Sequence, residues 1–218
     1  MNLVGHVAVA LAPGEPAPPV EFLVGCMLPD LAAIARVRMA RPVGDLGRGV
    51  EFHHACDAVF HESEWFRHVN RDLRDALLDA GVSSGAARAC SHAGAEMLLD
   101  GALVEHEHVA ERAQATLDAV DTTAGELGAL GPAESRDVLV ERLHLIGREL
   151  DPTRYGDARF VAERLHRMTA GRRRIELRAE HVDLVAGALV EWQPGIAAAA
   201  PAVLAAVRQG VPNHRHRV

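Results

Sequence analysis

Histidines and carboxylates recur at helical spacing in two stretches of this 218-residue chain, which holds 13 histidines. In the first stretch His53, Asp57 and His61 stand at positions i, i+4 and i+8, so one face of a helix would carry all three. The second stretch repeats this spacing with His92, Glu96 and Asp100. Apolar neighbours in both stretches predict that these faces point inward. Since a buried carboxylate is costly unless it is paired, protonated or ligated, the pattern favours a bound divalent cation.

Two further candidate ligands lie nearer the N-terminus, where His6 and Asp30 belong to separate predicted helices. Mixed nitrogen and oxygen ligands suit Mn, Fe, Zn or Ni, whereas ligation by oxygen alone suits Mg or Ca. The expected metal ligands are therefore His6, Asp30, His53, Asp57, His92, Glu96 and Asp100. Two readings without a metal stay open, namely hydrogen-bonded core histidines and solvated helix faces with ordinary i, i+4 pairs.

The elements that must position these residues are predicted to be helices, because no alternating strand pattern of useful length appears. The chain has no fixed-period repeat and no Ser/Gly linker, so we expect one all-α domain, a multi-helix bundle over residues 1–212, with 213–218 as a frayed tail. Residues 41–48 contain Pro42, Gly44 and Gly47 and predict a turn. The predicted helices cover 2–11, 20 to a break at Pro29, 50–60, 63–80, 84–103, 105–127, 133–149, 157–170, 178–191 and 195–208.

Composition excludes several kinds of chemistry. The chain contains no lysine, which rules out a Schiff-base lysine, a P-loop lysine and a Ser–Lys dyad. Its three cysteines lie far apart without a CxxC motif, so neither a zinc knuckle nor a disulfide framework is predicted, and a reduced cytoplasmic setting fits. The net charge of −7 disfavours a general nucleic-acid binder.

The sequence also predicts neither a targeting signal nor a membrane span. The first residues lack a charged n-region, so no signal peptide is predicted. The longest uncharged stretch, 192–207, contains two prolines and is shorter than the roughly 20 apolar residues of a spanning helix. We expect no membrane span, and interpret this stretch as a buried or subunit-facing helix through which a homodimer could form, with a helix on the membrane surface as the alternative.

Four short segments resemble bacterial acyl carrier protein phosphodiesterases, in the family's order over about residues 1–205. The opening MNLVGH, which ends at His6, and the segment GCMLPD, which ends at Asp30, resemble two of them. The segment GVEFH, which ends at His53 and precedes Asp57, resembles the third. The segment FVAERLHRMTAGRRRI at 160–175 resembles the family's helix with paired arginines.

The resemblance implies an all-helical, HD-like metal-dependent phosphohydrolase architecture. It implies an enzyme, a phosphoric diester hydrolase that releases 4′-phosphopantetheine from acyl carrier protein, with Mn²⁺ favoured and Fe, Zn or Mg as alternatives. An unligated histidine, His54 or His61, would protonate the leaving alkoxide or orient the water. In the absence of lysine, phosphate binding would fall to Arg172, Arg173 and Arg174, whose cluster could also steer in the acidic carrier protein.

The sequence also departs from the family pattern. Ala8 replaces the family's second N-terminal histidine, and Cys26 replaces an asparagine. The family's Asp-x-x-x-Asp-His helix appears here as His92 and Glu96 followed by Met97. Metal-competent groups are thus kept with changed identities, so two alternatives stay open. One is a phosphohydrolase that acts on a nucleotide or another small phosphoester, and the other is a non-catalytic helical protein that retains the scaffold.

Overall fold

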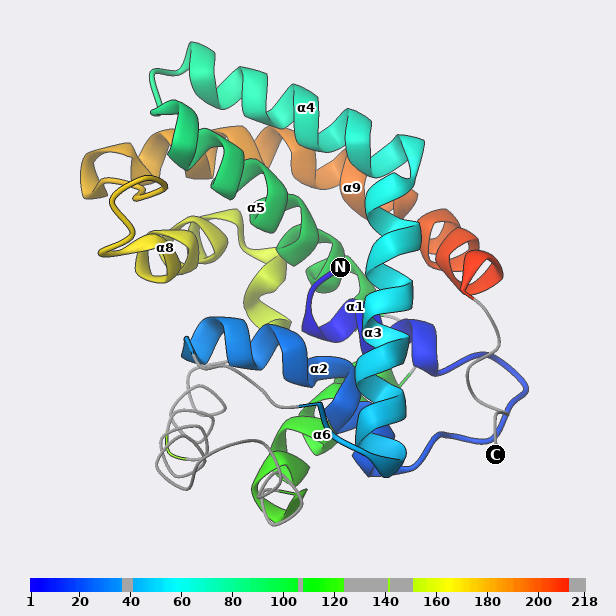
Figure 1. Ribbon diagram of the computed structural model, residues 1–218. Coiled ribbons are helices and arrows are strands. Elements are labelled where there is room, and N and C mark those ends of the chain that lie inside the picture. The colour runs from blue at the N-terminus through cyan, green and yellow to red at the C-terminus, as the bar shows by residue number, and fades with distance from the viewer. Residues whose placement is uncertain (37–40, 106–107, 124–140, 142–150, 212–218) are drawn as a thin grey trace.

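The computed structural model describes residues 1–36, 41–105, 108–123, 141 and 151–211, and every regular element in these ranges is helical. The all-α prediction is therefore confirmed, and Figure 1 shows the arrangement. The α-helices are α1 (Leu3–Ala10), α2 (Val20–Ala35), α3 (Gly44–Glu62), α4 (Glu64–Asp79), α5 (Ser84–Val104), α6 (Val109–Thr123), α8 (Ala158–Thr169) and α9 (Val182–Gly210). Short 3₁₀ helices, η2 (Pro152–Gly156) and η3 (Ala179–His181), precede α8 and α9.

Helix α1 lies inside the molecule, and all eight of its residues are buried. Its sequence, LVGHVAVA, has only one polar side chain, so the helix can be surrounded by apolar neighbours on every side. It packs against α2, α3, α5, α6 and α9, and Figure 1 shows it behind α3 with the N-terminus near the middle of the view. The single polar residue, His6, is fully buried as a result.

Helices α2 and α3 cross with their backbones in contact. A Cβ atom on Gly25 would lie 2.2 Å from the carbonyl oxygen of Leu46, and one on Gly49 would lie 2.1 Å from that of Phe22. No side chain larger than hydrogen fits at either position. The close crossing brings together the C-terminal half of α2, with Asp30, and the middle of α3, with His53 and Asp57.

Replacing Gly49 with alanine is expected to lower the free energy of unfolding by about 3 kcal/mol, because the methyl group must push two backbones apart. The matched control is Gly187→Ala on the exposed face of α9, where a Cβ meets nothing within 4 Å. That change should leave stability equal or raise it by up to about 1 kcal/mol through helix propensity. Urea unfolding of both variants measures the difference, and equal stability of the two would contradict the close crossing.

Three expected boundaries were wrong. The predicted turn over 41–48 is in part helix, because α3 begins at Gly44. Gly47 allows close packing, since a Cβ there would lie 2.4 Å from the carbonyl oxygen of Pro42, whereas Gly44 begins the helix with a φ of 65°. The predicted helix over 133–149, apart from Glu141, and the predicted tail at 213–218 lie outside the described residues.

The other two errors concern prolines inside helices. Helix α2 continues through Pro29, and α9 runs unbroken through Pro194 and Pro201 where two helices were expected. A proline removes one backbone hydrogen bond, but tertiary packing can outweigh that loss. Both helices bury a long apolar face; in α9 that face includes Ile196 and Val203.

The segment Ala179–Gly210 is long and apolar enough to cross a membrane by length and composition. A core helix passes the same test, so this property alone is weak evidence for a span. In the structure α9 packs against α8, α5, α4, α3 and α1, which buries Val185 and Leu189. The predicted absence of a membrane span stays a prediction.

Candidate metal centre

The first group of metal-competent side chains comes from three helices: His6 on α1, Asp30 on α2 and His53 on α3. One ligand atom from each lies within 4.8 Å of the others, which suits one shared cation. Asp57 adjoins the group, with its Oδ1 3.2 Å from His6 Nε2 and its Oδ2 3.3 Å from His53 Nε2. Four of the seven expected ligands therefore meet.

The histidine rings are held in orientations that suit ligation. His53 Nδ1–H donates to the carbonyl oxygen of Cys26 at 2.8 Å, which leaves Nε2 facing the group. Such a backbone acceptor is the usual partner that fixes the tautomer of a metal-binding histidine. His6 stacks on His53 with ring centroids 3.9 Å apart, and its Nε2 lies 3.0 Å from the carbonyl oxygen of Met1. His6 Nε2 thus faces the group, and its Nδ1 is buried with no hydrogen-bond partner.

Burial sets the charge of His6 and Asp30 in a way that fits a cation. Burial, together with the neighbouring His53, lowers the pKa of His6 to about 3, so its imidazole is neutral, which is the form that binds metals. Burial likewise raises the pKa of Asp30 to about 7, and its Oδ2 has no hydrogen-bond partner. A cation would supply the missing partner and favour the ionised carboxylate.

Asp57 and His53 form a charged pair beside this group. Burial raises the pKa of Asp57, but hydrogen bonds from His53 and His6 outweigh it and hold that pKa well below its usual range. For His53, burial lowers the pKa, whereas Asp57 and Asp30 raise it, and the net pKa is raised. The pair shows that this corner of the site stabilises positive charge.

A second group of ligand atoms lies on α3 and α5, where His61, His92 and Glu96 come within 4.8 Å of one another. Glu96 Oε1 is 2.9 Å from His61 Nε2 and 3.3 Å from His92 Nε2. Burial raises the pKa of Glu96, but the Met1 amine and the two histidines outweigh it and keep the carboxylate ionised. Two imidazoles and one carboxylate form a set that can hold a second cation.

The two groups adjoin each other across the α-amine of Met1. This amine lies 2.9 Å from Asp57 Oδ1 and 3.1 Å from Glu96 Oε1, and it is buried. Burial lowers its pKa, but Glu96 and Asp57 outweigh that effect and raise it. A positive charge thus already lies between the two carboxylates, in agreement with the cation-binding chemistry of the flanking residues.

Two predicted residues lie outside both groups. Asp100 is fully buried, but its Oδ2 accepts from Val4 N–H at 2.8 Å and its Oδ1 from Gly5 N–H at 2.9 Å. Both oxygens therefore satisfy the free amides at the start of α1. His54 is exposed, and its ring meets His53 edge-on with centroids 5.3 Å apart. Of the two predicted catalytic histidines, only His61 lies among the candidate ligands.

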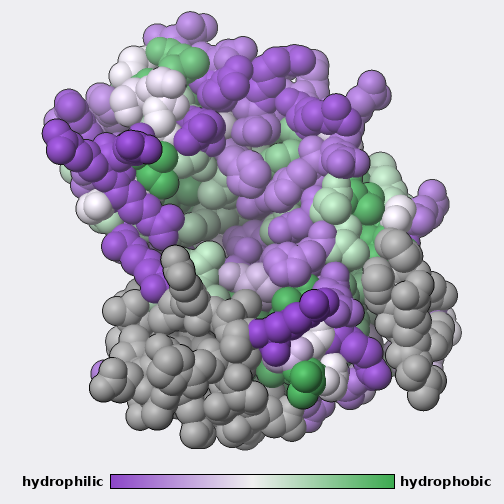
Figure 2. Space-filling view, in the orientation of Figure 1, coloured by the Kyte–Doolittle hydropathy of each residue, from purple (hydrophilic) through white to green (hydrophobic). Residues whose placement is uncertain are grey.

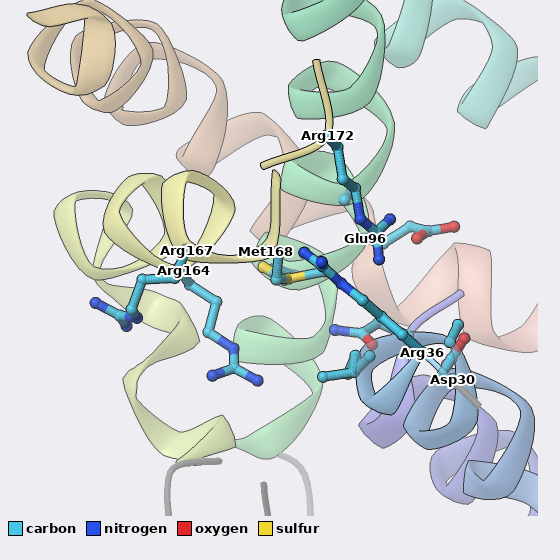
Figure 3. Close-up of a pocket in the computed structure, with 12 residues that line it drawn as sticks. Asp30, Arg36, Glu96, Arg164, Arg167, Met168 and Arg172 are labelled. Carbon is cyan, nitrogen blue, oxygen red and sulfur yellow. The ribbon is translucent and has the colours of Figure 1, made fainter. Parts of the chain in front are cut away.

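A pocket of about 320 Å³ opens beside the groups, between α2, α5 and α8. Asp30 and Glu96 line it together with four arginines. In Figure 3, Arg36 extends from the end of α2 that carries Asp30, Arg172 lies beside Glu96, and Arg164 and Arg167 come from α8. The space-filling view shows this face hollowed near its middle, with hydrophilic residues around much of the hollow (Figure 2). The pocket therefore places positive charge near two of the candidate metal ligands, Asp30 and Glu96.

The arginines of the pocket agree only in part with the prediction. Arg172 lines it, whereas Arg173 and Arg174 are exposed and are not among its lining residues. The others that line it are Arg36, Arg164 and Arg167. Sequence reasoning missed Arg36, which ends α2 in the left-handed conformation with φ of 58°. To place Arg36 at the pocket, the predicted helix would have had to continue through Pro29, whereas the proline favoured a break there.

Comparison with protein-family models, with curated proteins and with solved structures found no match to this chain. The resemblance to acyl carrier protein phosphodiesterases thus rests on the four quoted segments alone and stays a prediction.

Proposed function

We propose that this protein is a metal-dependent phosphoester hydrolase of HD-like type, with His6, Asp30, His53 and Asp57 as the residues that hold the cation. The observation that supports it most is the position of Asp30, which belongs to the ligand group and also lines a pocket to which four arginines contribute. Carboxylates and imidazoles hold cations, whereas guanidinium groups bind phosphate oxygens. A phosphoester is the substrate class that needs both at once.

The residues of the two ligand groups and of the pocket then have defined roles. A bound divalent cation supplies an acidified water and neutralises charge on phosphoryl oxygens. His53 is held by the Cys26 carbonyl in the tautomer that ligation requires, and Asp57 orients both rings of the first group. His61, about one-third exposed and hydrogen-bonded to Glu96, can exchange a proton with solvent and pass it to a leaving alkoxide. The arginines of the pocket would bind phosphate oxygens of the substrate.

The substrate is expected to be acyl carrier protein bearing phosphopantetheine, or a nucleotide or other small phosphoester. Protein stripped with chelator and reloaded with Mn²⁺ should hydrolyse bis(p-nitrophenyl) phosphate about 100-fold faster than the stripped protein. Mass spectrometry of holo acyl carrier protein from the same reaction shows whether phosphopantetheine is released.

Three outcomes separate the alternatives. Loss of phosphopantetheine supports the carrier-protein substrate. Turnover of the model diester alone supports the reaction class with a small substrate. If neither substrate is hydrolysed by protein that holds one or two equivalents of Mn, Fe or Zn, the proposed function is rejected and the non-catalytic scaffold is favoured.

A further inference from the structure

The arginines that line the pocket carry more positive charge than its two carboxylates can neutralise. Four arginines and two carboxylates line it, and no ion pair joins these arginines to a carboxylate among the described residues. The carboxylates, Asp30 and Glu96, are engaged with the histidine groups instead. An anion bound by these arginines would balance this charge.

Arg164 is the residue that points most directly to a ligand. Its side chain comes from α8, only 5% of the residue is exposed, and its Nε–H has no hydrogen-bond partner. An unpaired donor in a buried charged group is costly, because it has lost water and gained nothing in return. Figure 3 shows its guanidinium directed from α8 toward the space between α8 and α2.

The protein also holds Arg164 in place. The hydroxyl of Tyr155, in η2, lies near the side chains of Arg164 and Asn2, which oppose the rise in its pKa that burial causes, and Tyr155 is 1% exposed. The backbone at Tyr155 itself packs on Gly101, where a Cβ would lie 2.4 Å from the Tyr155 carbonyl carbon. The packed Tyr155 ring beside Arg164 therefore restricts the guanidinium before any ligand binds, which lowers the entropic cost of binding one.

Arg36 closes the same end of the pocket from the opposite side. Its left-handed backbone, unusual for a residue with a side chain, turns the arginine out of the end of α2. Its guanidinium donates to the carbonyl oxygen of Ala170 at 2.9 Å, just before the turn that carries Arg172. Arg36, Arg164 and Arg172 thus come from three points of the chain and extend into one space, whereas Arg167 turns outward in Figure 3.

The volume of the pocket exceeds what one phosphate group needs. At about 320 Å³ it equals roughly ten water molecules at liquid density. A phosphoester that reaches the His6–Asp30–His53 group through Asp30 would fill only part of it. A second anion in the remaining space is attracted by the arginines and repelled by Asp30 and Glu96, so it would lie against Arg164, which is on α8, away from Asp30.

We infer that Arg164, with Arg36 and Arg172, forms a subsite for a second phosphate group of the substrate, separate from the scissile phosphoester. The assignment of the scissile group to the metal ligands rests on the proposed function. The substrate class is then a phosphoester that carries a further phosphate, which favours a small bisphosphorylated molecule over a carrier protein with its single phosphodiester.

Inorganic phosphate tests the subsite in the absence of metal. Calorimetry on chelator-stripped full-length protein should show binding that Arg164→Gln weakens about tenfold or more. Tyr155→Phe keeps the bulk of the ring and removes only the hydroxyl that lies near Arg164, so it should weaken binding by a smaller factor in a folded protein. The control Arg178→Gln removes an exposed arginine that pairs with Glu180 and does not line the pocket, and it should bind as the wild type does.

A matched pair of ligands tests the substrate class on Mn²⁺-loaded protein. Propane-1,3-diyl bisphosphate should bind about tenfold more tightly than propyl phosphate, and Arg164→Gln should abolish this preference. Equal affinity for the two ligands, or unchanged phosphate binding in the Arg164 and Tyr155 variants, would overturn the subsite even if the protein hydrolyses phosphoesters. Arg164-dependent phosphate binding without hydrolysis of any diester would keep the subsite and reject the proposed function.

Discussion

Replacing His53 with alanine is expected to lower the affinity of the protein for a divalent cation by about 100-fold or more. His53 is 2% exposed, and its Nε2 is the one ring nitrogen that the Cys26 hydrogen bond leaves free. It also pairs with Asp57 Oδ2 at 3.3 Å and stacks on His6. The substitution thus removes one ligand and loosens two others. Metal content after dialysis and calorimetric titration with Mn²⁺ measure the loss, and hydrolysis of the model diester should fall with it.

The matched control is His54→Ala, one residue further along α3. His54 is exposed, and the structure does not include it among the candidate ligands. Metal affinity should stay within about twofold of the wild type in this variant. Because alanine at 53 opens a space beside His6, His53→Gln serves as a second variant that preserves side-chain volume. Wild-type metal affinity in folded His53→Gln and His53→Ala proteins would contradict the site.

The helical spacing of the sequence was sufficient to place some of these residues together. His53 and Asp57 are one turn apart on α3 and form an ion pair, as their i, i+4 spacing predicts. His92 and Glu96 do the same on α5. These are local relationships, and the period of a helix is enough to define them.

Contacts between different helices could not be predicted from the period of a single helix. The same period that placed Glu96 at the centre also placed Asp100 on its face, yet Asp100 turns to the start of α1. The difference depends on the position along α5 at which α1 packs, and no pattern within α5 encodes that position. Arg36 was missed for a similar reason. Its role depends on the continuation of α2 through Pro29, which brings the Arg36 guanidinium to the carbonyl oxygen of Ala170.

Asp100→Ala is expected to destabilise the protein by about 3 kcal/mol, which in a chain of this length lowers Tm by roughly 6–12 °C. The carboxylate accepts from the buried N–H groups of Val4 and Gly5, and alanine would leave both amides without a partner. Helix α1 has no side-chain cap at Asn2, so nothing on the helix itself replaces these bonds. Thermal unfolding measures the effect, and the exposed Asp75→Ala on α4 is the control, expected within about 0.5 kcal/mol of the wild type.

The same residue should make stability depend on pH between about 4 and 8. Burial raises the pKa of Asp100 from 3.8 to about 8, although the two backbone amides favour the charged form and oppose the shift. Between these two pKa values the folded state binds a proton that the unfolded state has released, so stability falls as pH rises from about 4 to about 8 and levels off above that. The slope of this loss reaches about 1.4 kcal/mol per pH unit. Asp100→Asn cannot ionise and should lack that component, so subtracting its urea-unfolding profile from that of the wild type isolates it; identical slopes would mean that Asp100 is already ionised at pH 7.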